Sequence, residues 1–330
     1  MNNIIKNIAC VLALAAATLP AYGDGGSPAY STPSLSGAGR PVSSITLQGS
    51  ALFPESIDFR YATQTFYVTG FNDGSIQTVS RYGISSVLQP SGTDGRVAAL
   101  GVKVDAQRGR LWVVDPGTIY TYDLRTNRLL KKTAITDVVS VSSSLINDLV
   151  IDRFGNAYVT DSTNAYIYRV DGRTLQASVW LDVSGTVPYG QQNGVPFNLN
   201  GIVLTPDQHY LIVGKTNDGS FWRIDTATKA IREISLPAPL TFADGITWGA
   251  GKLYVMRNFI NTISRVTFSS DYSSATIEAV AANNIEVPTA ASFVGGQLYV
   301  VNSQFDHYPA FGGDGVPNPP FTLSVVPAGK

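Results

Sequence analysis

A sixfold internal repeat is the feature of this 330-residue sequence that most restricts its fold. Each repeat contains a turn followed by a short apolar run, and the six runs are TQTFYVTG (63–70), RGRLWVVD (108–115), FGNAYVTD (154–161), DQHYLIVG (207–214), AGKLYVMR (250–257) and GGQLYVVN (295–302). The residues at the centres of the runs are spaced by 45, 46, 54, 42 and 45 positions, and they are Tyr67, Trp112, Tyr158, Ile212, Tyr254 and Tyr299. A repeat of this length is typical of β-propeller blades, whereas a pair of β-sandwiches would not produce it.

Each repeat also predicts one strand before the run and one after it, joined mostly by short turns rich in Asn, Asp and Gly. Five repeats contain a fourth strand, at 84–89, 128–135, 177–182, 231–236 and 275–281. The sixth repeat has only three, which would leave an open edge in the ring. The early segment SSITLQG (43–49) can fill this edge. The sequence therefore predicts an all-β, six-bladed propeller over residues 44–330, closed by an N-terminal strand.

The beginning of the chain predicts export. Residues 1–23 contain one cation followed by about a dozen apolar residues, fewer than the roughly 20 that a membrane-spanning helix needs. The small residues Ala21 and Gly23 predict cleavage after Gly23, and the only cysteine, Cys10, would leave with this signal peptide. Residues 24–43 are rich in Gly, Ser and Pro and predict a flexible leader. We expect a secreted or periplasmic protein without a membrane segment.

The charge balance argues against one class of partner. The chain has 23 Lys and Arg residues against 24 Asp and Glu residues, for a formal net charge of −1. Proteins that bind nucleic acids need an excess of basic side chains to neutralise phosphates. We therefore expect no nucleic-acid partner.

The repeat also identifies residues that should lie in a ring around the central tunnel. The position just before each innermost strand is occupied by Glu55, Leu100, Asn147, Asn200, Asp244 and Thr289. Four of these six offer carboxylate or amide oxygens, which are the ligands that a hard cation such as Ca²⁺ prefers. From spacing alone, a metal site competes with a second interpretation, in which these side chains only cap the loops that precede the strands.

Four short motifs at these positions, FPESIDF, INDLVID, LNGIVLT and ADGITW, resemble those of the SMP-30/gluconolactonase family, whose six-bladed relatives include diisopropyl fluorophosphatase and the paraoxonases. The resemblance implies that Glu55, Asn147, Asn200 and Asp244 bind Ca²⁺ or another divalent cation. It also implies hydrolysis of lactones or phosphotriester-like esters, in which Asp244 is the proton acceptor or nucleophile. The alternatives are that Asp244 is purely a ligand, that the propeller binds a molecule or protein around a structural Ca²⁺, or that it is a strictosidine-synthase-like enzyme.

Two long segments should form pocket walls on the metal side, VSGTVPYGQQNGVPFNL (183–199) and QFDHYPAFGGDGVPNPP (304–320). His307 in the second segment is a candidate base, although a single loop histidine is more often a polar surface residue. The family's arginine and acidic pairs that would recognise a sugar acid are not identifiable in these segments. This departure puts gluconolactone itself in doubt as the substrate.

Overall fold

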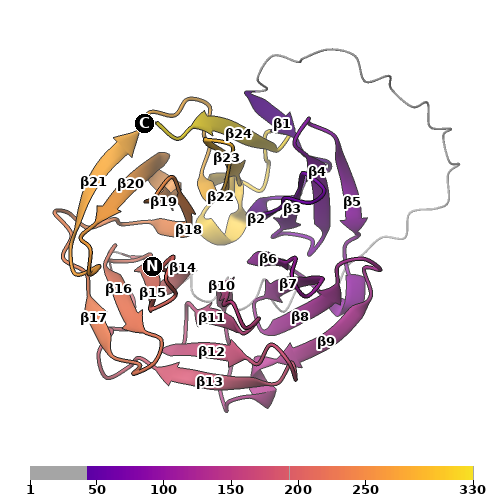
Figure 1. The fold of residues 1–330 in the computed structure, drawn as a ribbon. Coiled ribbons are helices and arrows are strands. Elements are labelled where there is room, and N and C mark those ends of the chain that lie inside the picture. Colours follow the sequence, from indigo (N-terminus) through magenta and orange to yellow (C-terminus); the bar gives the residue numbers. More distant parts are fainter. Residues whose placement is uncertain (1–42, 193, 330) are drawn as a thin grey trace, which may run out of the picture.

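Six antiparallel, four-stranded sheets form a ring around a central tunnel in the computed structural model, which describes residues 43–192 and 194–329 (Figure 1). The predicted all-β, six-bladed propeller is therefore confirmed. The predicted signal peptide and all of the predicted leader except Ser43 lie outside the described residues. The helices of the described part are single 3-10 turns, none of them long and apolar enough to cross a membrane.

The strands follow one another from the tunnel outwards in each of the first five blades. Blades one to three consist of β2 (Pro54–Arg60), β3 (Thr65–Gly70), β4 (Ile76–Ser80) and β5 (Ser85–Gln89); β6 (Val102–Asp105), β7 (Arg110–Asp115), β8 (Thr118–Asp123) and β9 (Leu129–Ala134); and β10 (Ile146–Ile151), β11 (Ala157–Asp161), β12 (Tyr166–Val170) and β13 (Ala177–Asp182). Blades four and five consist of β14 (Leu199–Leu204), β15 (Tyr210–Lys215), β16 (Phe221–Asp225) and β17 (Ile231–Glu233); and β18 (Ala243–Gly249), β19 (Lys252–Arg257), β20 (Thr262–Phe268) and β21 (Ala275–Val280).

Blade six is built from both ends of the described chain. It consists of β22 (Pro288–Val294), β23 (Gln297–Asn302), β24 (Thr322–Pro327) and the N-terminal strand β1 (Ser44–Thr46). β1 pairs antiparallel with β24, and Ile45 lies opposite Leu323. The predicted closure is therefore confirmed. The outer edge of β24, which would otherwise be exposed, is paired with β1.

The fourth strand of blade four is shorter than predicted. β17 ends at Glu233, whereas the sequence pattern predicted strand through residue 236. Ser235 instead forms a bridge to Ser274 of the neighbouring blade, where its amide donates to the Ser273 carbonyl at 2.9 Å. This contact diverts the chain from its own sheet before Pro237, a residue that cannot donate to a strand ladder.

The apolar core lies between the blades. Six clusters of buried side chains are present, and each one joins two neighbouring blades. The cluster between blades six and one contains Ile45 and Leu47, at 1% and 2% exposure, packed with residues such as Phe59 and Tyr299. The closing segment therefore completes a core as well as a sheet.

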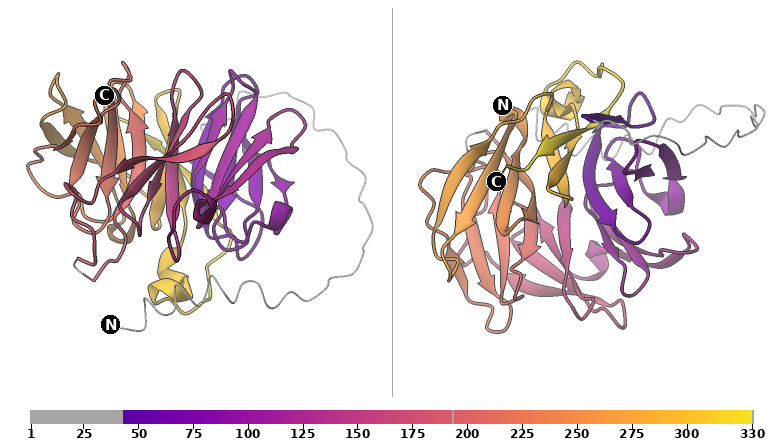
Figure 2. Two further views of the ribbon diagram at one scale, coloured as in Figure 1. Left: turned by 90° about the horizontal axis from the view of Figure 1, so that it is seen from below. Right: turned by 45° about the horizontal axis from the view of Figure 1, so that its top comes forward.

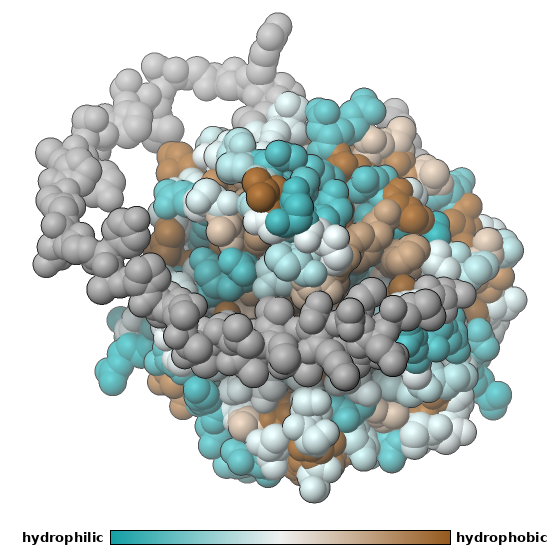
Figure 3. All heavy atoms as spheres, turned by 180° about the vertical axis from the view of Figure 1, so that it is seen from behind, coloured by the Kyte–Doolittle hydropathy of each residue, from teal (hydrophilic) through white to brown (hydrophobic). Residues whose placement is uncertain are grey.

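The outer surface is mixed in character. Hydrophilic and hydrophobic side chains are interspersed over the described part of the face seen from behind (Figure 3), as is usual for folded domains. The connection between β23 and β24 stands out in shape, because it projects beyond one end of the ring (Figure 2, left, yellow). It contains the 3-10 turns η4 (Phe305–His307) and η5 (Pro309–Phe311).

Deleting residues 24–50 should destabilise the propeller, because it removes Ile45 and Leu47 together with the β1 ladder. Full burial of two such side chains stabilises a fold by about 3–6 kcal/mol, and we expect a loss of unfolding free energy on this scale in chemical denaturation. The control is deletion of 24–40, which leaves β1 in place and should change the free energy little. Equal stabilities of the two truncated proteins would show that β1 does not close the ring.

Candidate functional site

The four predicted oxygen-bearing residues come together in the structure. Glu55, Asn147, Asn200 and Asp244 all line one cavity of about 640 Å³, which side chains from all six blades surround. The cavity therefore lies at one mouth of the central tunnel. Leu100 of blade two also lines it, so the ring position on that blade is apolar.

A shared backbone irregularity positions these side chains. The pairing register of β2, β10, β14 and β18 with the second strand shifts at Pro54/Ile57, Ile146/Leu149, Leu199/Ile202 and Ala243/Ile246. Each predicted donor lies inside one of these shifts. A β-bulge turns a side chain that would otherwise alternate between the two sheet faces, and here it leaves all four donors in the tunnel mouth.

The residue after two of the donors must be glycine, because neighbouring blades touch there. A Cβ atom on Gly201 would lie 2.4 Å from the Asp244 carbonyl oxygen, and one on Gly245 would lie 2.7 Å from the Thr289 oxygen. Both distances are far below a van der Waals contact. The Asn-Gly and Asp-Gly pairs of the motifs thus combine a donor with the close approach of two blades.

The two amides are oriented by hydroxyl groups of the residues that directly follow the second strands, β11 and β15. Ser162 donates to the Leu199 carbonyl at 2.7 Å, so its oxygen is left to accept from Asn147 Nδ2 at 3.2 Å. In the same way, Thr216 donates to the Ala243 carbonyl at 2.7 Å and accepts from Asn200 Nδ2 at 3.1 Å.

This orientation leaves the oxygens of both amides unused. Among the described residues, the buried Oδ1 atoms of Asn147 and Asn200 have no hydrogen-bond partner. A buried polar atom without a partner costs about 1–3 kcal/mol, so two of them in one wall indicate a ligand that both can bind.

The two carboxyl groups of the site are buried and repel each other. Glu55 is 7% exposed and Asp244 is 4% exposed. Burial raises the pKa of Glu55 well above its usual range, and the charges of Asp244 and Asp148 raise it further. Burial likewise raises the pKa of Asp244 to about 7, although Asn258 Nδ2 donates to its Oδ2 at 2.9 Å and opposes the rise. Both carboxylates would gain from a nearby cation.

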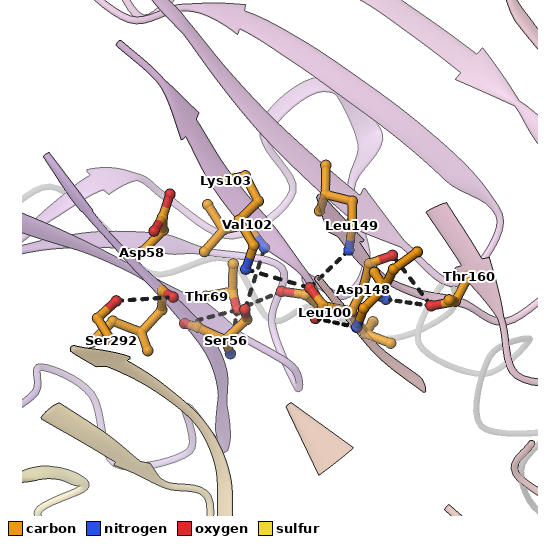
Figure 4. A network of polar contacts seen from close by, with 12 residues as sticks. Ser56, Asp58, Thr69, Leu100, Val102, Lys103, Asp148, Leu149, Thr160 and Ser292 are labelled. Carbon is orange, nitrogen blue, oxygen red and sulfur yellow. Dashed lines mark hydrogen bonds and ion pairs between the residues drawn. The ribbon is translucent and has the colours of Figure 1, made fainter. Parts of the chain in front are cut away.

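Charged side chains lie next to the donors. Lys103 and Asp148 line a small second cavity together with three of the donors, Glu55, Asn147 and Asn200, and Figure 4 shows the contact between Lys103 and Asp148. The Lys103 ammonium lies 3.6 Å from Asp148 Oδ1. The Asp58 carboxylate accepts a hydrogen bond of 2.7 Å from the backbone amide of Val104. Burial alone would lower the pKa of Lys103, but the charges of Asp148, Asp58 and Glu55 raise it overall. Lys103 is therefore a fixed positive charge below the donor ring, which our sequence analysis did not identify.

The upper walls of the cavity are aromatic. Both long segments contribute as expected, with Phe197 from the first and Phe305, Tyr308 and Phe311 from the second. The remaining aromatic walls are Phe71, Phe242 and Phe259. The space above the donors is therefore lined mainly by apolar surface.

His307 is not among the described residues that line the cavity. Its Nδ1 lies 3.1 Å from Asp314 Oδ1 and its Nε2 lies 3.3 Å from Asn318 Nδ2, so both ring nitrogens contact other parts of the same insertion. The hydrogen bond with Asp314 is the main factor that raises the pKa of His307. Through these contacts His307 stabilises the insertion.

Comparison with known structures shows that the fold is shared. The major allergen Mala s 1 of Malassezia sympodialis matches with a TM-score of 0.65 and 16% sequence identity, over 86% of this chain and 96% of that protein. The gluconolactonase XC5397 of Xanthomonas campestris matches with a TM-score of 0.58 and 16% identity, over 86% and 89% of the two chains. The calcium-binding protein regucalcin of Agrobacterium tumefaciens matches with a TM-score of 0.58 and 15% identity, over 85% and 93%.

No protein-family model and no curated protein sequence matches this chain. At 15–16% identity the three structural matches establish a common fold, and one fold hosts many unrelated functions. The function must therefore be argued from the site.

Replacing Gly201 by Ala should both destabilise the protein and disturb the donor ring, because the new methyl group would meet the Asp244 backbone. Overpacking of this kind costs about 1–3 kcal/mol, which thermal unfolding can measure. Gly185→Ala is the matched control, since a Cβ there has nothing within 4 Å. Equal melting temperatures of the two variants would contradict the close contact between blades.

The buried carboxyl pair predicts how stability depends on pH when divalent cations are removed. The pKa of Asp244 is raised from its usual 3.8 to about 7, so the folded protein holds a proton that the unfolded chain releases in this window. The free energy of unfolding should then fall as the pH rises from about 4 to about 7. Thermal melts in EDTA should show this decline, and Asp244→Asn should reduce it. A stability that rises over the same window in EDTA would contradict the assigned pKa.

Proposed function

We propose that this protein is an exported, Ca²⁺-dependent hydrolase of a lactone or a related ester. The observation that carries the proposal is the donor ring: two buried carboxylates and two amide oxygens without hydrogen-bond partners, in the wall of a single cavity. The proposal places the ion among Glu55, Asn147, Asn200 and Asp244.

The chemistry of the donors fits a hard divalent cation. All four donor atoms are oxygens, as Ca²⁺ prefers, and within the described residues no group of three or more His, Cys, Asp or Glu side chains forms a different metal site. Two carboxylates supply the two negative charges that balance such an ion. A site with few protein ligands also leaves coordination positions open for a substrate oxygen.

When bound, Ca²⁺ would act as a Lewis acid toward an ester carbonyl. The residues of the chain supply the rest. Asn258 holds one oxygen of Asp244 by a hydrogen bond at 2.9 Å, and the other oxygen can accept the proton of an attacking water molecule. The aromatic walls present apolar surface beside the reacting group, and electrostatic interactions are stronger next to such a low-dielectric surface than in water.

Other findings support the proposal. Two of the proteins that share the fold are a gluconolactonase and a calcium-binding protein, and the four motifs of this chain resemble the SMP-30/gluconolactonase family at the donor positions. Export rests on the signal-peptide pattern of residues 1–23.

Ca²⁺ binding can be tested apart from activity. Calorimetry on the mature chain should detect Ca²⁺ binding, and both Asp244→Asn and Glu55→Gln should weaken it, because each removes one anionic ligand while keeping the side-chain shape. Asp306→Asn is a matched control, since this exposed carboxylate belongs to the insertion but does not line the cavity. Unchanged affinity in both site variants would show that the ring is not the metal site.

Catalysis is tested by turnover on a panel of lactones and aryl esters, with and without EDTA. Asp244→Asn should lose about 10²-fold or more in turnover even at saturating Ca²⁺, the scale for removal of a general base. His307→Gln should stay within a few-fold of the wild type. The reverse pattern would assign the base role to His307. Ca²⁺ binding without hydrolysis of any compound would instead favour a ligand-binding propeller.

A further inference from the structure

The aromatic side chains above the donor ring meet at one residue, Phe311 of η5. Its ring centroid lies 6.2 Å from that of Phe71, 6.0 Å from Phe197 and 5.8 Å from Phe259. These three partners come from blade one, from the connection between blades three and four, and from blade five. Because they approach from different sides of the ring, Phe311 lies across the tunnel mouth, above the donors.

The segment that carries Phe311 is held in place by its own contacts. Gln304 and Asn318, near the two ends of the insertion, exchange two hydrogen bonds of 2.8 Å. The Gly315 amide donates to the His307 carbonyl at 2.8 Å, and the ring of Tyr308 packs edge-on against Phe53 at 4.9 Å. The insertion is therefore a preformed ceiling, and the space beneath Phe311 has a fixed size.

Few polar side chains line the cavity besides the four donors. Apart from the four donors, the polar side chains of the described lining are those of Asn72, Thr216, Asn258 and the hydroxyl-bearing Tyr308, and this lining contains no Arg, Lys or His. Thr216 and Asn258 are already engaged in orienting donors. A polyhydroxylated sugar lactone would therefore leave several of its hydroxyl groups without partners in this cavity, which weakens binding.

We infer that the cavity selects an ester or lactone with an apolar alkyl or aryl group, which packs beneath Phe311 while the carbonyl faces the donor ring. This inference rests on the proposed hydrolase function and narrows it to a substrate class. The cavity volume of about 640 Å³ lies within the usual range for sites that enclose a small organic molecule. Phe311 is then the residue that limits the length of the apolar group.

The selectivity test compares γ-nonalactone, γ-butyrolactone and glucono-δ-lactone, all at saturating Ca²⁺. We expect kcat/KM for γ-nonalactone to exceed that for γ-butyrolactone by roughly 10²-fold, since the two differ by a pentyl group and each buried methylene contributes up to about fourfold. We also expect γ-nonalactone to be preferred over glucono-δ-lactone, whose hydroxyl groups would lose their water partners in the cavity. Ca²⁺-dependent hydrolysis with a preference for glucono-δ-lactone would overturn the inference but leave the proposed function standing. Absence of hydrolysis of all three lactones would contradict the proposed function.

Phe311→Ala should change selectivity more than chemistry. Removing the ceiling should raise KM for γ-nonalactone about tenfold or more, the scale for losing contacts with one large side chain, and should extend activity to longer lactones. kcat should change less. Phe154→Ala is the matched control, because Phe154 is 65% exposed on another part of the molecule. An unchanged chain-length profile in Phe311→Ala would refute the role assigned to this residue.

A binding measurement keeps the inference testable without turnover. The neutral apolar dye N-phenyl-1-naphthylamine should bind the wild-type protein in EDTA with enhanced fluorescence, and γ-nonalactone should displace it while glucono-δ-lactone should not. Phe311→Ala should weaken dye binding, whereas Phe154→Ala should not. If neither the dye nor γ-nonalactone binds, the cavity is not an apolar binding site.

Discussion

The innermost strands of the six blades can share one tunnel only if they approach each other to backbone contact, and the site depends on this constraint. At Gly201 and Gly245 there is no room for a Cβ atom next to the neighbouring blade. Hydroxyl groups complete the contact, since Thr69 and Thr160 each donate to a carbonyl of the next blade at 2.7 Å. The β-bulges that contain these glycines also turn the side chains directly before them, those of Asn200 and Asp244, into the tunnel mouth. Ring closure and donor placement thus have one structural cause.

Several buried carboxyl groups in a narrow tunnel repel one another. The chain compensates this repulsion at one level of the tunnel and leaves it uncompensated at the other. Below the ring, the Lys103 ammonium compensates Asp148 and Asp58 from within the protein. At the ring itself, the described residues that line the cavity include no Lys, Arg or His. Burial raises the pKa values of both Glu55 and Asp244, the charge of Asp148 raises both further, and the charge of Asp244 also raises that of Glu55, although Lys103 partly opposes the rise at Glu55. The carboxyl groups that most need a cation, those of Glu55 and Asp244, therefore lie beside the Oδ1 atoms of Asn147 and Asn200, which have no hydrogen-bond partner among the described residues.

The repeat made the fold and the four donor positions predictable, because equivalent residues of successive blades must lie in one ring. The same spacing could have revealed the residues that orient the donors. Ser162, Thr216 and Asn258 each lie four positions after the central residue of their repeat. Lys103 was missed because a lysine in an alternating strand is usually a solvated side chain. The position of Phe311 could not be predicted, since it depends on the path of an insertion that has no counterpart in the other repeats.

Because the donors belong to the repeat and the cavity ceiling belongs to an insertion, two propellers with the same fold can share the donor positions and differ in the ceiling. The donors and their hydroxyl partners occupy repeated positions, so any propeller that keeps the blade geometry can keep them at low sequence identity. The ceiling comes from residues 304–320, which break the repeat and fold against themselves. The residues that would select a substrate under the proposed function therefore lie outside the repeat that supplies the donor ring. An apolar ceiling above the donor ring makes the two ends of the cavity chemically different. Under the proposed function, this contrast would orient an ester with its carbonyl toward the donors and its hydrocarbon group beneath Phe311.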